Sequence, residues 1–134
     1  MKRLIIVAAL TGGALLLLVP RYILPACEYE GYSPMHCSDT ARAEYLVGSL
    51  LIAVATGTYF TKKVSAVLFN AAVACLLFGI ALWLPDRIGY CHSSRMPCNY
   101  GMVPGVRFIA VTGLVLTAIA VYRLLRDRRK KGNP

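Results

Sequence analysis

The stretch VSAVLFNAAVACLLFGIALWL, residues 64–84, decides the fold of this chain: it is 21 residues long and carries no charged side chain. An α-helix rises about 1.5 Å per residue, so this segment spans about 31 Å, close to the thickness of the hydrocarbon core of a bilayer. We therefore predict that residues 64–84 cross a membrane as a helix.

Three further apolar blocks surround this segment and alternate with charged or cysteine-bearing stretches. They cover residues 4–24, 41–60 and 105–124. The composition agrees with membrane insertion, because 57% of the residues are hydrophobic and 16% are charged, whereas a soluble domain is more evenly divided. We predict an all-α integral membrane protein with four transmembrane helices in a single domain, residues 1–134, that ends in a basic tail at residues 125–134.

The amino terminus also has some features of a signal peptide. A basic start and an apolar run precede Leu24-Pro25-Ala26-Cys27, which is similar to a lipoprotein cleavage box. Arg21 interrupts the apolar run, and proline is a poor residue ahead of the small one. We expect an uncleaved first helix.

The lysines and arginines predict the orientation, because basic loops resist translocation. Ten of them fall before the first block, between the second and third blocks, and from Arg123 onward, where Asp127 is the only acid. The two other loops, residues 25–43 and 85–104, carry no net charge together with their flanks. Both termini are therefore expected in the cytoplasm, with the two loops on the other side of the membrane.

The total charge of +9 does not indicate nucleic-acid binding. It is accounted for by this topology and by a cationic tail that lies near anionic lipid. No basic fold remains once the four spans are removed, so the expected partners are the lipid membrane and a membrane protein or further copies of the chain.

Small residues recur inside the spans, as in helices that pack closely in lipid. They are Gly12, Gly13, Gly48, Ala53, Gly57, Gly79 and Gly113. Asn70 is an amide inside the third span and is expected to face another helix or a subunit through a hydrogen bond. Cys75 lies near the middle of the same span, and we interpret it as a small packing residue.

The start of the second helix brings polar groups close to the first loop. Ser38, Asp39 and Thr40 are competent helix caps, so Cys37 is expected at a helix amino terminus, where a thiolate is favoured if the sulfur is reduced. Arg42 and Glu44 could form a polar site beneath the loops. We expect them instead to be solvated at the membrane interface.

The chain reads as two similar hairpins, each made of a helix, an outer loop and a helix. Both loops end in Met-x-Cys before the returning helix, as Met35-His36-Cys37 in the first and Met96-Pro97-Cys98 in the second. Because both hairpins run in the same direction, the implied pseudo-twofold axis lies along the membrane normal and brings the loops together.

The loop cysteines support three interpretations. Outside the membrane, Cys27, Cys37, Cys91 and Cys98 are candidates for two structural disulfides, with three possible connectivities. A thiol-disulfide oxidoreductase is the second reading, although the cysteines lack the Cys-x-x-Cys spacing of catalytic pairs. Copper binding is the third, because thioether, imidazole and thiolate groups together suit Cu(I). Its candidate ligands are Met35, His36, Cys37, Cys91, His92, Met96 and Cys98.

Two segments of the chain are distinctive: residues 35–44, Met-His-Cys-Ser-Asp-Thr-Ala-Arg-Ala-Glu, and residues 96–101, Met-Pro-Cys-Asn-Tyr-Gly. Both resemble a family of small bacterial membrane proteins, domain of unknown function 4418 (DUF4418). The resemblance covers nearly the whole chain. It implies four spans with cysteine-rich outer loops. It also implies an accessory role beside membrane transporters, especially export permeases with their ATPases.

The sequence shows no phosphate-binding loop, nucleophile triad or pair of buried carboxylates, so hydrolysis and ATP-driven transport have little support. We expect a non-enzymatic accessory or scaffold protein whose disulfide-braced outer head contacts a partner. We assign no cofactor to this protein. The copper-binding protein and the membrane thiol-disulfide oxidoreductase remain the alternatives.

Overall fold

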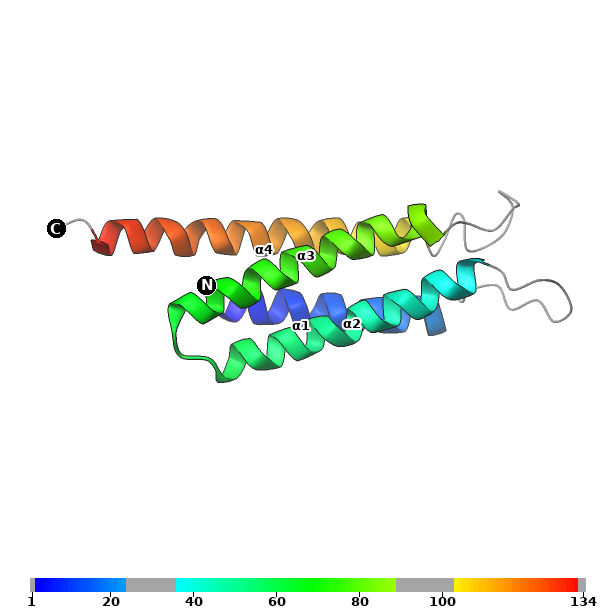
Figure 1. Ribbon diagram of the computed structural model, residues 1–134, viewed down its shortest axis with the longest axis horizontal. Coiled ribbons are helices and arrows are strands. Elements are labelled where there is room, and N and C mark those ends of the chain that lie inside the picture. The colour runs from blue at the N-terminus through cyan, green and yellow to red at the C-terminus, as the bar shows by residue number, and fades with distance from the viewer. Residues whose placement is uncertain (1, 24–35, 89–102, 133–134) are drawn as a thin grey trace, which may run out of the picture.

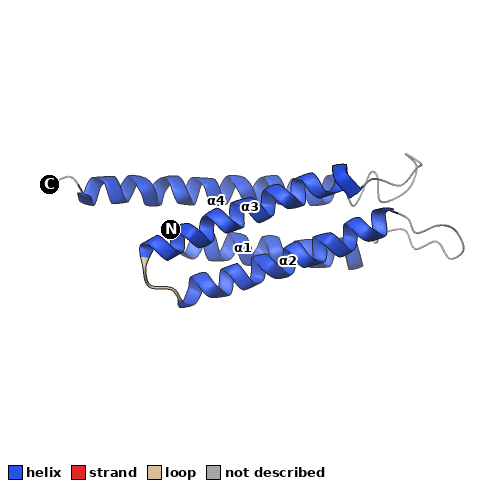
Figure 2. Cartoon of the chain, viewed as in Figure 1, coloured by secondary structure: helices blue, strands red, loops and turns tan. Residues whose placement is uncertain are grey.

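The computed structural model describes residues 2–23, 36–88 and 103–132, and these form an all-helical bundle (Figures 1 and 2). Its elements in chain order are α1 (Lys2–Leu18), the π-helical segment η1 (Val19–Ile23), α2 (His36–Phe60), α3 (Val64–Ile88) and α4 (Val103–Gly132). α1 contacts α2 and α4, and α3 contacts α2 and α4, so the four helices form a ring.

Consecutive helices run in opposite directions, which gives the bundle two distinct ends (Figure 1). At one end, here named the basic end, α1 and α3 begin and α2 and α4 finish. At the other end, here named the cysteine end, η1 and α3 finish and α2 and α4 begin. The described residues that flank both cysteine-bearing segments are therefore at the same end of the bundle.

Three of the described helices, α2, α3 and α4, are long and apolar enough to cross a membrane. α1 has 17 residues, or about 26 Å of helix, and continues into η1. The sequence predicts one uninterrupted span over residues 4–24, but a π-helical turn interrupts the α-helix before Pro20, whose missing N–H favours such a widening. That α1 spans a membrane stays a prediction.

The helices extend beyond several of the apolar blocks. α2 begins at His36, so the predicted position of Cys37 at a helix amino terminus is confirmed. Pro104 is the second residue of α4, where its lack of an N–H costs nothing. The basic tail is helical up to Gly132, which makes α4 30 residues and about 45 Å long.

Small residues and one aromatic ring form the core. Phe78 of α3 is fully buried between α1 and α4, where a Cβ on Gly12 would lie 2.6 Å from its ring and a Cβ on Gly113 would also overlap it. α1 and α2 meet at Gly13 and Gly48, since a Cβ on either would come within 2.9 Å of the other glycine's carbonyl oxygen. These four glycines have the packing role that the sequence predicts. Gly79 does not, because no atom of the described residues lies within 4 Å of a Cβ placed there.

Large apolar side chains such as Leu46, Phe69 and Phe108 are mostly exposed on the outside of the bundle. A small-residue interior with a large-residue exterior is the arrangement expected in lipid, where van der Waals contact holds helices together. Polar contacts close the ends. Lys2 Nζ donates to the carbonyl oxygens of Tyr59, at 3.1 Å, and of Thr61 beyond the end of α2, while Arg107 and Asp86 join α4 to α3 in a 2.5 Å ion pair.

Candidate functional site

The sulfur-bearing segments lie mostly outside the described residues. Cys27, Met35, Cys91, His92, Met96 and Cys98 all fall there. His36 and Cys37 are described by their backbone alone, in the first turn of α2. The predicted disulfides and copper ligands therefore stay predictions. Among the described residues, no group of three or more His, Cys, Asp or Glu side chains could hold a metal ion.

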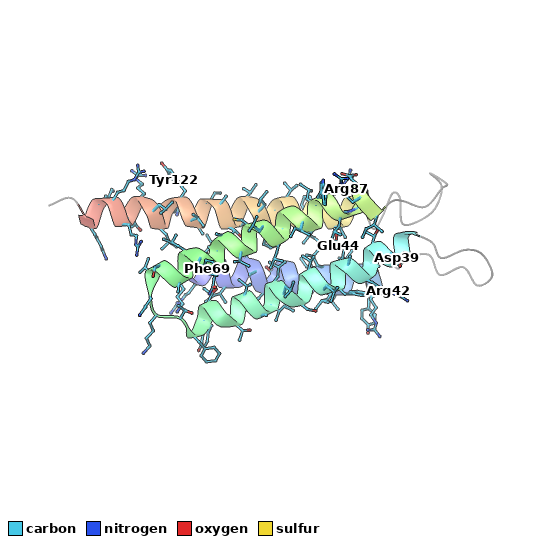
Figure 3. All side chains as sticks on the ribbon, in the orientation of Figure 1. Asp39, Arg42, Glu44, Phe69, Arg87 and Tyr122 are labelled. Atoms are coloured by element: carbon cyan, nitrogen blue, oxygen red, sulfur yellow. The ribbon has the colours of Figure 1, made fainter. Side chains whose placement is uncertain are left out.

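Besides the ion pair of Asp86 and Arg107, the first turns of α2 bring polar groups to the cysteine end. Asp39 and Arg42 are exposed, and Arg42 points away from the bundle, whereas Glu44 points toward the other helices (Figure 3). The Glu44 side chain is 0% exposed. The expectation of a solvated Glu44 is therefore wrong, because the helix turns this position into the core.

Glu44 is buried because it shares the inner face of α2 with small and apolar side chains. Ala41, Val47 and Leu51 lie at helical spacing on either side of it, and all three belong to the main apolar core. The sequence contains this signal, since Glu44 is four residues before the packing residue Gly48. Because residues four apart share a helix face, Glu44 is expected on the same side of α2 as Gly48, which faces the interior of the bundle.

Neither carboxyl oxygen of Glu44 has a hydrogen-bond partner among the described residues. Hydroxyl groups in the same bundle are satisfied within their own helices: the buried Thr58 donates to the Val54 carbonyl oxygen at 2.7 Å, and Thr117 to that of Gly113 at 2.7 Å. The threonine hydroxyl lies close enough to the helix backbone to donate a hydrogen bond to a carbonyl oxygen in the preceding turn. Burying a polar group without a partner costs free energy, and a charged one costs far more, so Glu44 is an unsatisfied acceptor in the described bundle.

Asn70 and Cys75, the other two intramembrane residues of interest, lie apart from Glu44. Asn70 is partly buried and turns toward α2, with its amide nitrogen 3.8 Å from the place a Cβ on Gly57 would take. No hydrogen bond involves Asn70 within the described residues, so its predicted interhelical bond stays a prediction. Cys75 has a free thiol on the outer side of α3.

The helical bundle and the sequence of its cysteine end agree with a known family. The model of the family described as domain of unknown function (DUF4418) matches residues 9–123. The chain belongs to this family. The resemblance predicted from the Met-x-Cys segments is thereby confirmed. No curated protein and no solved structure matches the chain.

In this DUF4418 protein, the cysteine end therefore combines two kinds of group. Two segments rich in sulfur and imidazole groups are tethered there by their flanks, and one buried carboxyl lies two helical turns into α2. A buried carboxyl can accept a proton, a hydrogen bond or a cation.

Proposed function

We propose that this DUF4418 protein is a small, non-enzymatic accessory or scaffold subunit in the bacterial inner membrane. Its head is the pair of cysteine-bearing segments, held outside the cytoplasm and braced by disulfides among Cys27, Cys37, Cys91 and Cys98. The head contacts a membrane-protein partner, and a transporter is the partner that family membership suggests.

One observation carries this proposal: the flanks of both cysteine-bearing segments lie at the same end of the bundle (Figure 1). Two short segments tethered side by side can form one surface, whereas segments at opposite ends could not. Disulfides stabilise such a surface by restricting the unfolded chain, which small extracytoplasmic structures need because they cannot build a large core.

The burial of Glu44 near the cysteine end also favours this end of the molecule as the site of function. An ionisable residue buried at membrane depth is costly to keep, and such residues mark binding or transport sites by default. Its position in the third turn of α2 couples it mechanically to Cys37, which lies two turns earlier on the same helix. A partner that shifts the start of α2 would change the surroundings of the carboxyl.

Co-purification in mild detergent tests the accessory role. The full chain, tagged at its carboxyl end, is expected to bring a membrane protein with it from the native membrane. Cys37→Ser combined with Cys98→Ser should reduce that recovery severalfold, while Cys75→Ser, a matched change inside α3, should leave it intact. A chain that purifies alone, or equal recovery from both variants, contradicts the proposal.

The thiol state separates the scaffold from its two alternatives. Alkylation of the membrane-extracted chain before and after reduction, followed by mass spectrometry, should find four blocked sulfurs and one free thiol at Cys75. Four free thiols with bound copper would favour the copper-binding protein instead. A labile mixture of oxidised and reduced cysteines would favour the thiol-disulfide oxidoreductase.

A further inference from the structure

An apolar groove of about 840 Å³ lies between α3 and α4 on the outer side of the bundle, away from Glu44 and the core. Small side chains on α3, at Ala72, Cys75 and Gly79, form its floor. Its remaining lining is Leu76, Ile80, Trp83, Ala118, Val121, Tyr122 and Leu125. It follows about 16 Å of α3, from Ala72 to Trp83, and about 10 Å of α4, from Ala118 to Leu125.

Gly79 explains why this face is hollow. No atom in the described part of the chain lies within 4 Å of a Cβ placed there, so this glycine does not hold two helices of the bundle together as Gly113 does. Tyr122 projects from α4 away from the other helices, at the edge of the groove (Figure 3). In a bilayer the groove opens directly to the hydrocarbon region, so its occupant is an acyl chain or another helix.

The basic end of α4 shows which of these occupants fits. Residues three and four apart share a helix face, so Arg128 and Arg129 lie beyond Leu125 on the side of α4 that lines the groove. Both arginines are exposed. The groove thus leads from apolar walls at membrane depth to two guanidinium groups at the interface, where lipid phosphates lie.

A second copy of the chain fits this face less well. Closed membrane dimers of one topology are related by an axis along the membrane normal, so two copies that met at this groove would bring their cationic helix ends together. Each end carries Arg126, Arg128, Arg129, Lys130 and Lys131 against Asp127 alone. Like charges at that distance repel, whereas an anionic head group neutralises them.

We propose that the α3–α4 groove binds an anionic phospholipid, with an acyl chain along Ala72, Cys75 and Gly79 and its phosphate held by Arg128 and Arg129. The lipid belongs to the leaflet at the basic end. This site would tie the long α4 to α3 on the outer side of the bundle, whereas Phe78 packs the helices on the inner side.

Fluorescence quenching by brominated lipids tests the site, because Trp83 is the chain's single tryptophan. Trp83→Phe combined with Tyr122→Trp places the only indole at the basic end of the groove. Trp83→Phe combined with Tyr59→Trp places it on α2 at the same end but outside the groove, on a side chain that is equally exposed. Each variant is reconstituted as the full chain in phosphatidylcholine vesicles with brominated phosphatidylglycerol or brominated phosphatidylcholine at equal mole fraction.

Phosphatidylglycerol is expected to quench the groove indole more strongly than phosphatidylcholine does, and the two lipids should differ little at the α2 indole. Arg128→Gln with Arg129→Gln should weaken the preference by about fivefold for each arginine removed. Lys130→Gln with Lys131→Gln removes the same charge just beyond them on α4, at positions that are three or four residues from none of the groove residues, and should leave most of the preference.

Two results would overturn the proposal. Equal quenching of the groove indole by both lipids would mean that the groove has no preference for an anionic head group. Weak quenching by both lipids, with efficient cross-linking between copies that is lost in Cys75→Ala, would mean that a second chain fills the groove.

Discussion

At the scale of single residues, Glu44 and Phe78 show two opposite uses of a buried side chain. Phe78 fills the space left by two glycines and is held on both sides. Glu44 occupies a core position in which no described group hydrogen-bonds to either carboxyl oxygen. The first residue stabilises the bundle, and the second costs stability, which makes it the better candidate for a function.

Replacing Glu44 should therefore stabilise the isolated chain. Glu44→Met exchanges an unsatisfied buried carboxyl for an apolar side chain of similar length, and the free energy of unfolding should rise by about 1–3 kcal/mol. Equilibrium unfolding in detergent measures it. Asp39→Asn, an exposed change one turn earlier, should stay within about 0.5 kcal/mol. If Glu44→Met lowers stability instead, the carboxyl has a stabilising partner. Weaker recovery of a co-purifying protein with Glu44→Met would link the residue to the proposed head.

Gly113 and Gly79 give a matched pair for the core and the lipid face. Gly113→Ala places a methyl group into the Phe78 ring, and the ring cannot retreat because Gly12 lies on its other side. We expect a loss of about 1–3 kcal/mol in the free energy of unfolding. Gly79→Ala meets no atom within 4 Å and should cause no loss. Thermal unfolding of the two variants in one detergent compares them, and equal losses would contradict the assignment of Phe78 as the central contact.

At the scale of the helices, the contact between α1 and α2 depends on backbone approach. A Cβ on Gly48 would meet the Gly13 carbonyl oxygen, and a backbone atom cannot move without moving its helix. Gly48→Ala should therefore cost about 1–3 kcal/mol and separate α1 from α2. Gly57→Ala on the same helix meets only the Asn70 amide at 3.8 Å and is its control. Cysteine cross-linking between α1 and α2 would detect the separation, and unchanged cross-linking in Gly48→Ala would count against close backbone contact.

The sequence predicts which segments are helical better than it predicts which side of each helix is buried. Residues 64–84 could form only a long apolar helix, and the helical tail follows from good helix formers after Tyr122. The burial of Glu44 was predictable only by following the phase of Gly48, because composition alone places a glutamate near a membrane end in water. The outward position of Gly79 could not be predicted, since a glycine suits both a tight helix contact and an open groove.

At the scale of the whole molecule, the distribution of charge distinguishes the two ends of the bundle. The basic end holds the amino-terminal lysine and arginine, Lys62 and Lys63, and the charged end of α4. The cysteine end has Asp86 paired with Arg107 and an exposed Asp39. The positive-inside rule relates this asymmetry to orientation, and the proposed head depends on it, because disulfides persist only on the oxidising side.

Single cysteines placed at the two ends test the orientation directly. On a background with all five native cysteines replaced by serine, Asp39→Cys marks the cysteine end and Gly132→Cys marks the end of α4. A membrane-impermeant maleimide applied to intact spheroplasts should label the Asp39→Cys chain and leave the Gly132→Cys chain unlabelled until the membrane is permeabilised. The reverse pattern would place the sulfur-rich segments in the reducing cytoplasm, where stable disulfides are rare. Copper binding by reduced thiolates would then be favoured over a disulfide-braced head. The basic end of the α3–α4 groove would lie in the outer leaflet.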